Sequence, residues 1–172
     1  QNVPSCKPKD VLDLDAPRFT QWWDRAVEGM ASGIRLLQQE CGLLTEAWLP
    51  YDTIVLPLAA VLARIGAPSG PSAAAHRHKL VRWYWCAVFG QVFESGAMSR
   101  TTKDFSEILR WLNGGNEPDT VAGFNFEPET LRDTTARQRA LYRGTISLVL
   151  RGAPRDFYTG APLTRDLMIE KD

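Results

Sequence analysis

The sequence predicts a mainly α-helical protein, a bundle of about five helices followed by a short C-terminal β-hairpin. Apolar residues recur at steps of three and four over five stretches, as they do on the buried face of a helix. Clusters of glycine and proline separate these stretches, and after Gly152 the periodicity becomes that of short strands. The 172 residues, 44% of them hydrophobic, are enough to form one well-buried core.

The first long helix is predicted from Pro17 to Gly42. Asp15 can cap its start, and Gly42 can lie just past its end. We expect Trp22 or Trp23 to reach the core. The apolar positions of this stretch follow one face of the helix and are Phe19, Trp22, Trp23, Ala26, Val27, Met30, Ile34, Leu37 and Cys41.

A turn at residues 49–52 precedes the stretch Thr53–Ile65, which is apolar on nearly all sides. A helix of this kind is buried by its neighbours, so we expect it at the centre of the bundle, with the run from Ile54 to Leu62 in the core. Pro57 lies inside the stretch and predicts either a kink or a late start of the helix.

The third helix is predicted from Ala73 to about Phe93, after a loop formed by Pro68–Ser72. It contributes Trp83 or Trp85 to the expected core. Within it, Arg77–Trp85 mixes basic and aromatic residues, as in some proteins that bind nucleic acid by charge and stacking. Trp83 and Trp85 diverge on a helix, however, and tryptophan is more often a core residue than a stacking platform.

A fourth, shorter helix is predicted to open at a capping box formed by Thr101 and Asp104. Its apolar face ends at Asn113–Gly115, where two glycines interrupt the pattern. The stretch from Gly114 to Asn125 is rich in turn residues.

A fifth helix is predicted to open at a second box, Thr135 with Gln138, and to stop at Gly152. One half of this helix carries four arginines, Arg137, Arg139, Arg143 and Arg151. The opposite half is apolar and carries Leu141, Tyr142, Ile146, Leu148 and Val149. The arginines form either a solvated face or a face that contacts the phosphates of a nucleic acid.

The last twenty residues predict a β-hairpin: a strand at Asp156–Tyr158, a turn at Thr159–Pro162 and a second strand at Leu167–Ile169. We therefore divide the chain into a helical domain, residues 1–152, and the start of a second domain, residues 153–172. The opening Gln1 and the strand-like pattern at the end, with no cap after it, predict that the chain is part of a longer protein.

Composition excludes several classes of protein. Twenty basic residues balance twenty acidic ones, so no net field attracts the whole chain to nucleic acid or a membrane. Three widely spaced cysteines, Cys6, Cys41 and Cys86, suit reduced thiols better than disulfides or zinc. The chain has no membrane-spanning run and no leader, which predicts a cytoplasmic protein.

No motif for catalysis is present in the sequence. His76 and His78 are the two histidines, and their spacing turns them about 200° apart on a helix, which does not suit one metal ion. Neither lies beside a nucleophile elbow, and no P-loop or dinucleotide-binding glycine motif occurs. We therefore expect no catalytic, cofactor-binding or metal-binding residues here.

Three strings carry a family resemblance: Leu49–Leu58, Lys79–Phe89, and Leu141–Gly144 through Arg155–Gly160. In this order and spacing they resemble the middle of GmrSD-type proteins, which are modification-dependent (type IV) restriction endonucleases of bacterial phage defence. The resemblance covers approximately Phe19 to the end of the chain.

The resemblance implies a parent protein with a ParB-like N-terminal domain that binds and hydrolyses nucleotide, a helical middle and a C-terminal HNH nuclease. The hairpin from Asp156 to Ile169 matches the strands that lead into the HNH site. Neither the family's Asp-Gly-Gln-Gln-Arg motif nor its His-His-containing HNH motif occurs in this sequence. Divalent metal and nucleoside triphosphate are thus expected for the parent and not for this chain.

Two functions from different classes follow from the sequence. The first is a non-catalytic helical scaffold that contacts DNA through Arg137, Arg139, Arg143 and Arg151, between the ParB-like and HNH domains. The alternative is a free-standing helical protein-interaction domain unrelated to nucleic acid. A small enzyme ranks last because no set of polar residues has the spacing of an active site.

Overall fold

A computed structural model describes the chain except for residues 1–4, 6, 133, 135, 137–138 and 165–172. The mainly helical fold is confirmed, and the five long helices correspond to the five predicted ones. The elements among the described residues are α1 (Pro8–Leu12), α2 (Ala16–Glu40), η1 (Glu46–Trp48), η2 (Asp52–Ile54), α3 (Val55–Ile65), α4 (Ala73–Phe89), α5 (Ala97–Leu112), α6 (Asp119–Ala122), α7 (Glu129–Arg132) and α8 (Ala140–Arg151).

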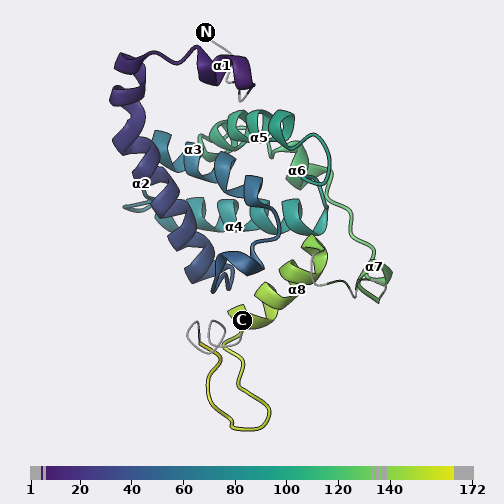
Figure 1. The fold of residues 1–172 in the computed structure, drawn as a ribbon. Helices are drawn as coiled ribbons and strands as arrows, with labels where there is room; N and C mark the ends of the chain where they lie inside the picture. Colours follow the sequence, from purple (N-terminus) through teal and green to yellow (C-terminus); the bar gives the residue numbers. More distant parts are fainter. Residues whose placement is uncertain (1–4, 6, 133, 135, 137–138, 165–172) are drawn as a thin grey trace.

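Helix α3 lies at the centre of the bundle, as its sequence predicts. It packs along α2 on one side and against α5 on another, while α4 contacts α6 and α8 (Figure 1). Ile54, Leu58 and Val61 are fully buried. The helix begins only two residues before Pro57, so the proline sits in the first turn, where its missing N–H leaves no bond unmade. The late start is therefore confirmed.

Helix α2 begins and ends where its sequence indicates. The carboxylate of Asp15 accepts a hydrogen bond from the backbone N–H of Arg18, at 2.8 Å, and so caps the first turn. Gly42 follows the helix with a φ of +70°. Halfway along, a Cβ on Gly29 would lie 2.7 Å from the Cβ of Ala63, so the absence of a side chain lets α2 and α3 approach closely.

Of the tryptophans predicted to reach the core, Trp83 does so and is fully buried. Trp22 and Trp23 do not: they are 39% and 52% exposed, so the prediction for α2 is wrong. The reason is the length of the partner helix. Because α3 ends at Ile65, opposite the middle of α2, the first turns of α2 extend beyond it (Figure 1).

The predicted capping box of α5 is also wrong. The helix begins at Ala97, after Gly96 in a left-handed conformation, so Thr101 lies one turn inside it. The Thr101 hydroxyl donates to the carbonyl of Ala97 at 2.9 Å, and Asp104 is fully buried. Helix α4 also ends earlier than predicted, at Phe89, because Gly90 terminates it.

After α8 the described chain makes a turn with one antiparallel bridge, between Arg155 and Pro162. Tyr158, predicted to lie in a strand, lies instead in this turn, because its N–H and that of Thr159 both donate to the Asp156 carboxylate. The predicted second strand, Leu167–Ile169, and the capping pair Thr135 and Gln138 lie outside the described residues. No described helix is both long and apolar enough to cross a membrane.

Candidate functional site

The predicted arginine face is divided between different environments. Arg139 immediately precedes α8 and is exposed, and Arg151 ends the helix and is also exposed. Arg143 is half-buried, and its Nη1 donates to the carbonyl of Leu49 at 3.1 Å. Arg139 and Arg151 are separated by roughly 120° around the helix at about 100° per residue. Arg137 lies outside the described residues, so the structure describes two exposed arginines and one that anchors the helix.

The buried face of α8 coincides only in part with the apolar half seen in the sequence. It consists of Ala140, Leu141, Gly144, Ser147 and Leu150. Leu148 and Val149, which the sequence places on the apolar half, are 44% and 55% exposed. The outward half of α8 is therefore partly apolar.

Close packing explains which face of α8 is buried. A Cβ on Gly144 would come within 2.5 Å of a methyl group of Val88 on α4. A Cβ on Gly42 would come within 2.6 Å of the backbone nitrogen of Arg151. Side chains as large as leucine cannot enter these two contacts, so α8 places Gly144 against α4 and the backbone of Ser147 and Arg151 against Gly42.

The start of α8 is also attached to η1. The ring of Tyr142 stacks on that of Trp48, with centroids 6.4 Å apart. The Arg143 guanidinium binds the Leu49 carbonyl beside this stack. The guanidinium of Arg143 both donates a hydrogen bond and packs against its neighbours, and lysine would not reproduce this planar donor geometry. Arg143 is thus a structural residue, whatever the surface of α8 binds.

The basic and aromatic run of α4 is occupied by contacts within the molecule. Lys79 donates to the carbonyl of Trp111 at 2.7 Å and lies 5.1 Å from the centroid of its ring. Arg82 is bound to Glu117. With Trp83 buried, these contacts agree with the structural interpretation of the run and not with a stacking platform.

The histidines and cysteines show no catalytic arrangement among the described residues. His76 is half-buried and His78 is exposed at the start of α4, and no group of three or more potential ligands among these residues could hold a metal ion. Cys41 and Cys86 are free and buried, and burial raises the pKa of the Cys41 thiol to about 12. That thiol is protonated at neutral pH and is a poor nucleophile.

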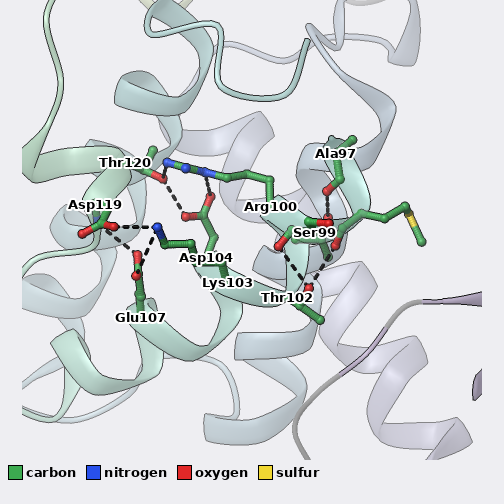
Figure 2. A network of polar contacts seen from close by, with 11 residues as sticks. Ala97, Ser99, Arg100, Thr102, Lys103, Asp104, Glu107, Asp119 and Thr120 are labelled. Atoms are coloured by element: carbon green, nitrogen blue, oxygen red, sulfur yellow. Dashed lines mark hydrogen bonds and ion pairs between the residues drawn. The ribbon is translucent and has the colours of Figure 1, made fainter. Parts of the chain in front are cut away.

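A polar network between α5 and α6 is the main feature that the sequence did not reveal (Figure 2). The Thr120 hydroxyl donates to Oδ1 of Asp104 at 2.6 Å, and Arg100 donates to the same hydroxyl at 2.5 Å. The Nε of Arg100 lies 3.4 Å from Oδ2 of Asp104. The spacing of Arg100 and Asp104, four residues apart on a helix, is the one sequence signal for this pair.

The outer part of the network joins Lys103, Glu107 and Asp119 (Figure 2). Lys103 binds Asp119 at 2.6 Å, and the backbone N–H of Asp119 donates to Glu107 at 3.0 Å. Glu107 and Asp119 line an open pocket of about 680 Å³, together with Glu117. Glu107 and Asp119 both lie within ion-pair distance of Lys103, and Glu117 is bound to Arg82, so these contacts fasten α6 to α5.

The buried Asp104 leads to a prediction about stability and pH. Burial raises its pKa above the ordinary 3.8, although Thr120 and Arg100 act in the opposite direction. Between these two pKa values the folded protein binds more protons than the unfolded chain does. The contribution of Asp104 to the free energy of unfolding therefore falls as pH rises above 3.8 through the folded-state pKa, and recovers on acidification.

We expect Asp104→Asn to remove this component of the pH dependence, measured by urea unfolding across the acidic range. Thr120→Val removes a hydrogen bond that favours the carboxylate, so it should move the folded-state pKa further up and widen the same window. If Asp104→Asn and the wild type lose stability in parallel as pH rises above 3.8, the assignment to Asp104 is incorrect.

Comparisons with known proteins give one distant similarity. The chain is 24% identical, over 164 residues, to the uncharacterized protein MJ0686 of Methanocaldococcus jannaschii. The alignment covers 90% of this chain but only 27% of the archaeal protein, so the chain spans about a quarter of the length of this relative. No protein-family model matches the sequence, and no solved structure shows a significant match.

Proposed function

We propose that this chain is the helical middle module of a GmrSD-type, modification-dependent restriction endonuclease. In that protein it connects a ParB-like nucleotide-hydrolysing domain to an HNH nuclease. Metal, nucleotide and the catalytic groups belong to those neighbouring domains, so this chain acts as a scaffold. The support is the order and spacing of the strings at Leu49–Leu58, Lys79–Phe89 and Leu141–Gly160.

The scaffold role is supported by where the exposed apolar side chains lie in the sequence. Of the sixteen large hydrophobic side chains exposed among the described residues, eight lie between Val11 and Ile34 and four between Leu148 and Tyr158. Exposed apolar area of this kind is typical of surfaces that contact another domain or protein. Its concentration near both ends of the chain is what a module between two neighbours requires.

The turn after α8 fits the proposed start of the nuclease domain. The bridge between Arg155 and Pro162 is reinforced by a hydrogen bond from the Asp156 N–H to the Ala161 carbonyl, at 2.8 Å. We propose that this pair opens the hairpin that leads into the HNH domain, with the domain boundary at residue 152. A hairpin alone is marginal in water, which suits an element completed by a following domain.

The DNA contact is proposed for the exposed arginines that border α8, Arg139 and Arg151. An arginine at the surface can neutralise a phosphate and release the counterions bound to it. Loss of such an arginine therefore makes DNA binding less dependent on salt concentration. Arg143 is left out of the variant below, because its loss would also break the hydrogen bond to the Leu49 carbonyl.

We expect the double variant Arg139→Ala, Arg151→Ala of the intact parent to bind every DNA sequence more weakly. Its log–log salt slope should fall by about 0.9 per lost contact, with selectivity for modified bases unchanged. Fluorescence anisotropy at several salt concentrations measures both quantities. The matched control is Arg64→Ala, Arg110→Ala, which removes the same charge from exposed positions on α3 and α5.

Unchanged affinity and slope in the double variant would favour the second candidate function, a protein-interaction domain with no role in DNA binding. The observation that favours this alternative is the exposed aromatic face of α2, where Trp22, Trp23 and Phe19 meet solvent. An equal loss in the control variant would point to net charge and not to a contact at α8.

A further inference from the structure

Helix α8 is weakly embedded in the bundle. It lies at the edge, where it packs on α4, with η1 beside its start (Figure 1). The large apolar side chains that it buries are Leu141 and Leu150. Helix α3, of nearly the same length, buries Leu58, Val61 and Leu62 among others. Because the free energy of burial follows the apolar area removed from water, α8 is held less firmly than α3.

The described chain on either side of α8 does little to anchor the helix. No described residue in 122–139 or 151–164 is buried. In the first of these segments the ring of Phe126 meets that of Phe89, with centroids 5.4 Å apart, but this contact lies well before α8. The second segment extends away from the bundle (Figure 1). The position of α8 therefore depends mainly on the contacts of the helix itself.

The closest contacts of α8 involve glycines. Gly144 faces a methyl group of Val88, and Gly42 faces the backbone of Ser147. Because glycine has no side chain to interlock, these contacts can separate without a change of rotamer. The hydroxyl of Ser147 is fully buried and has no hydrogen-bond partner among the described residues, so undocking would give it water as a partner. The hydrogen bond that Arg143 donates to η1's neighbouring carbonyl would likewise be exchanged for bonds to water, at small net cost.

We infer that α8 undocks from the bundle as a unit while helices α2 to α6 stay folded. The inference goes beyond the proposed function and does not depend on it. The exposed residues Arg139 and Arg151 border the helix, so undocking moves these two charges relative to the bundle. Cys41 precedes the glycine that rests against α8 and is completely buried in the docked state, so the same motion gives its thiol access to solvent.

Hydrogen exchange of this chain at increasing urea concentration separates such a local motion from global unfolding. Once undocked, a helix of this length is marginal in water, so its amides exchange. The amides of residues 144–151 should exchange at least about a hundredfold faster than the most protected amides of α4. Their exchange should depend little on urea, because undocking exposes little surface. Exchange of both helices at the same rate, with the same urea dependence, would overturn the inference.

Gly144→Ala should favour the undocked state, because the added Cβ would lie 2.5 Å from the Val88 methyl group. Alanine stabilises an isolated helix relative to glycine, so faster exchange confined to α8 would report weaker docking. We expect the exchange of residues 144–151 to rise about tenfold or more, with α4 unchanged. Leu148→Ala is the matched control, since this side chain is 44% exposed on the same helix and its loss should leave the docking intact. An equal rise in α4 would mean that α8 unfolds only with the core.

Alkylation of Cys41 provides an independent readout in the native protein. Its rate, measured by mass spectrometry of the peptide that contains it, should rise in Gly144→Ala by the same factor as exchange in α8, and should not rise in Leu148→Ala. Cys86 is the internal reference, because it is buried on α4 and should react at one slow rate in the wild type and both variants. If Cys41 and Cys86 react together, at the rate of global unfolding, α8 does not move independently and the inference is wrong. Neither readout involves DNA, so failure of the proposed DNA contact would leave this result unaffected.

Discussion

Replacing Gly42 by alanine is expected to destabilise the protein by about 3 kcal/mol. The residue has a φ of +70°, a conformation that costs an L-residue roughly 1–2 kcal/mol. Its Cβ would also meet the backbone carbonyl of Ser147 and the backbone nitrogen of Arg151 on α8. Backbone atoms cannot rotate away, so α8 must shift, and overpacking of this kind costs typically about 1–3 kcal/mol.

Urea unfolding measures the loss, and Gly70→Ala separates its two components. Gly70 has nearly the same φ, +72°, but nothing lies within 4 Å of its Cβ position. Gly70→Ala should therefore show the conformational cost alone, about 1–2 kcal/mol. The buried Cys41 thiol provides a second readout, since displacement of α8 should let a thiol reagent reach it faster. Equal losses for the two alanine variants would mean that α8 does not rest on Gly42.

The substitution Trp83→Ala is expected to have the largest effect, a loss of about 3–5 kcal/mol, which is a large part of the stability of an ordinary domain. Trp83 is fully buried and meets the ring of Phe93 edge to face, with centroids 6.4 Å apart. Alanine would leave a cavity beside Phe93 and Asp104 that rigid helices fill only in part. The free energy of unfolding in urea measures this loss.

Trp23→Ala is the matched control for Trp83→Ala. The side chain is 52% exposed on α2, so removing it should change the free energy of unfolding by about 0.5 kcal/mol or less. Should Trp83→Ala be too unstable to purify, Trp83→Phe keeps most of the volume and should still lose more stability than Trp23→Ala. A larger loss from Trp23→Ala than from Trp83→Phe would contradict the assignment of the core.

Local sequence patterns were sufficient to predict the helices themselves. The step of three and four residues identified α2 almost from end to end, and the lack of a polar side identified α3 as central. Asp15 and Gly42 marked the ends of α2, because caps depend on residues that are adjacent in the chain. The capping box at Thr101 was wrong, because identifying a cap requires the start of the helix to be known and α5 begins one turn earlier, at Ala97.

The tertiary structure decided which apolar faces are covered, and this determines the candidate sites. Trp23 belongs to an apolar stripe, yet it lies where α2 extends past the end of α3, and Val149 lies on the side of α8 away from the contact of Gly144 with Val88. The spacing of Asp104 from Thr101 suggests a capping residue, but in the structure Asp104 is buried and accepts a hydrogen bond from Thr120 of α6. Periodicity reports which residues share a face, whereas burial depends on the length and closeness of a partner helix far away in the sequence.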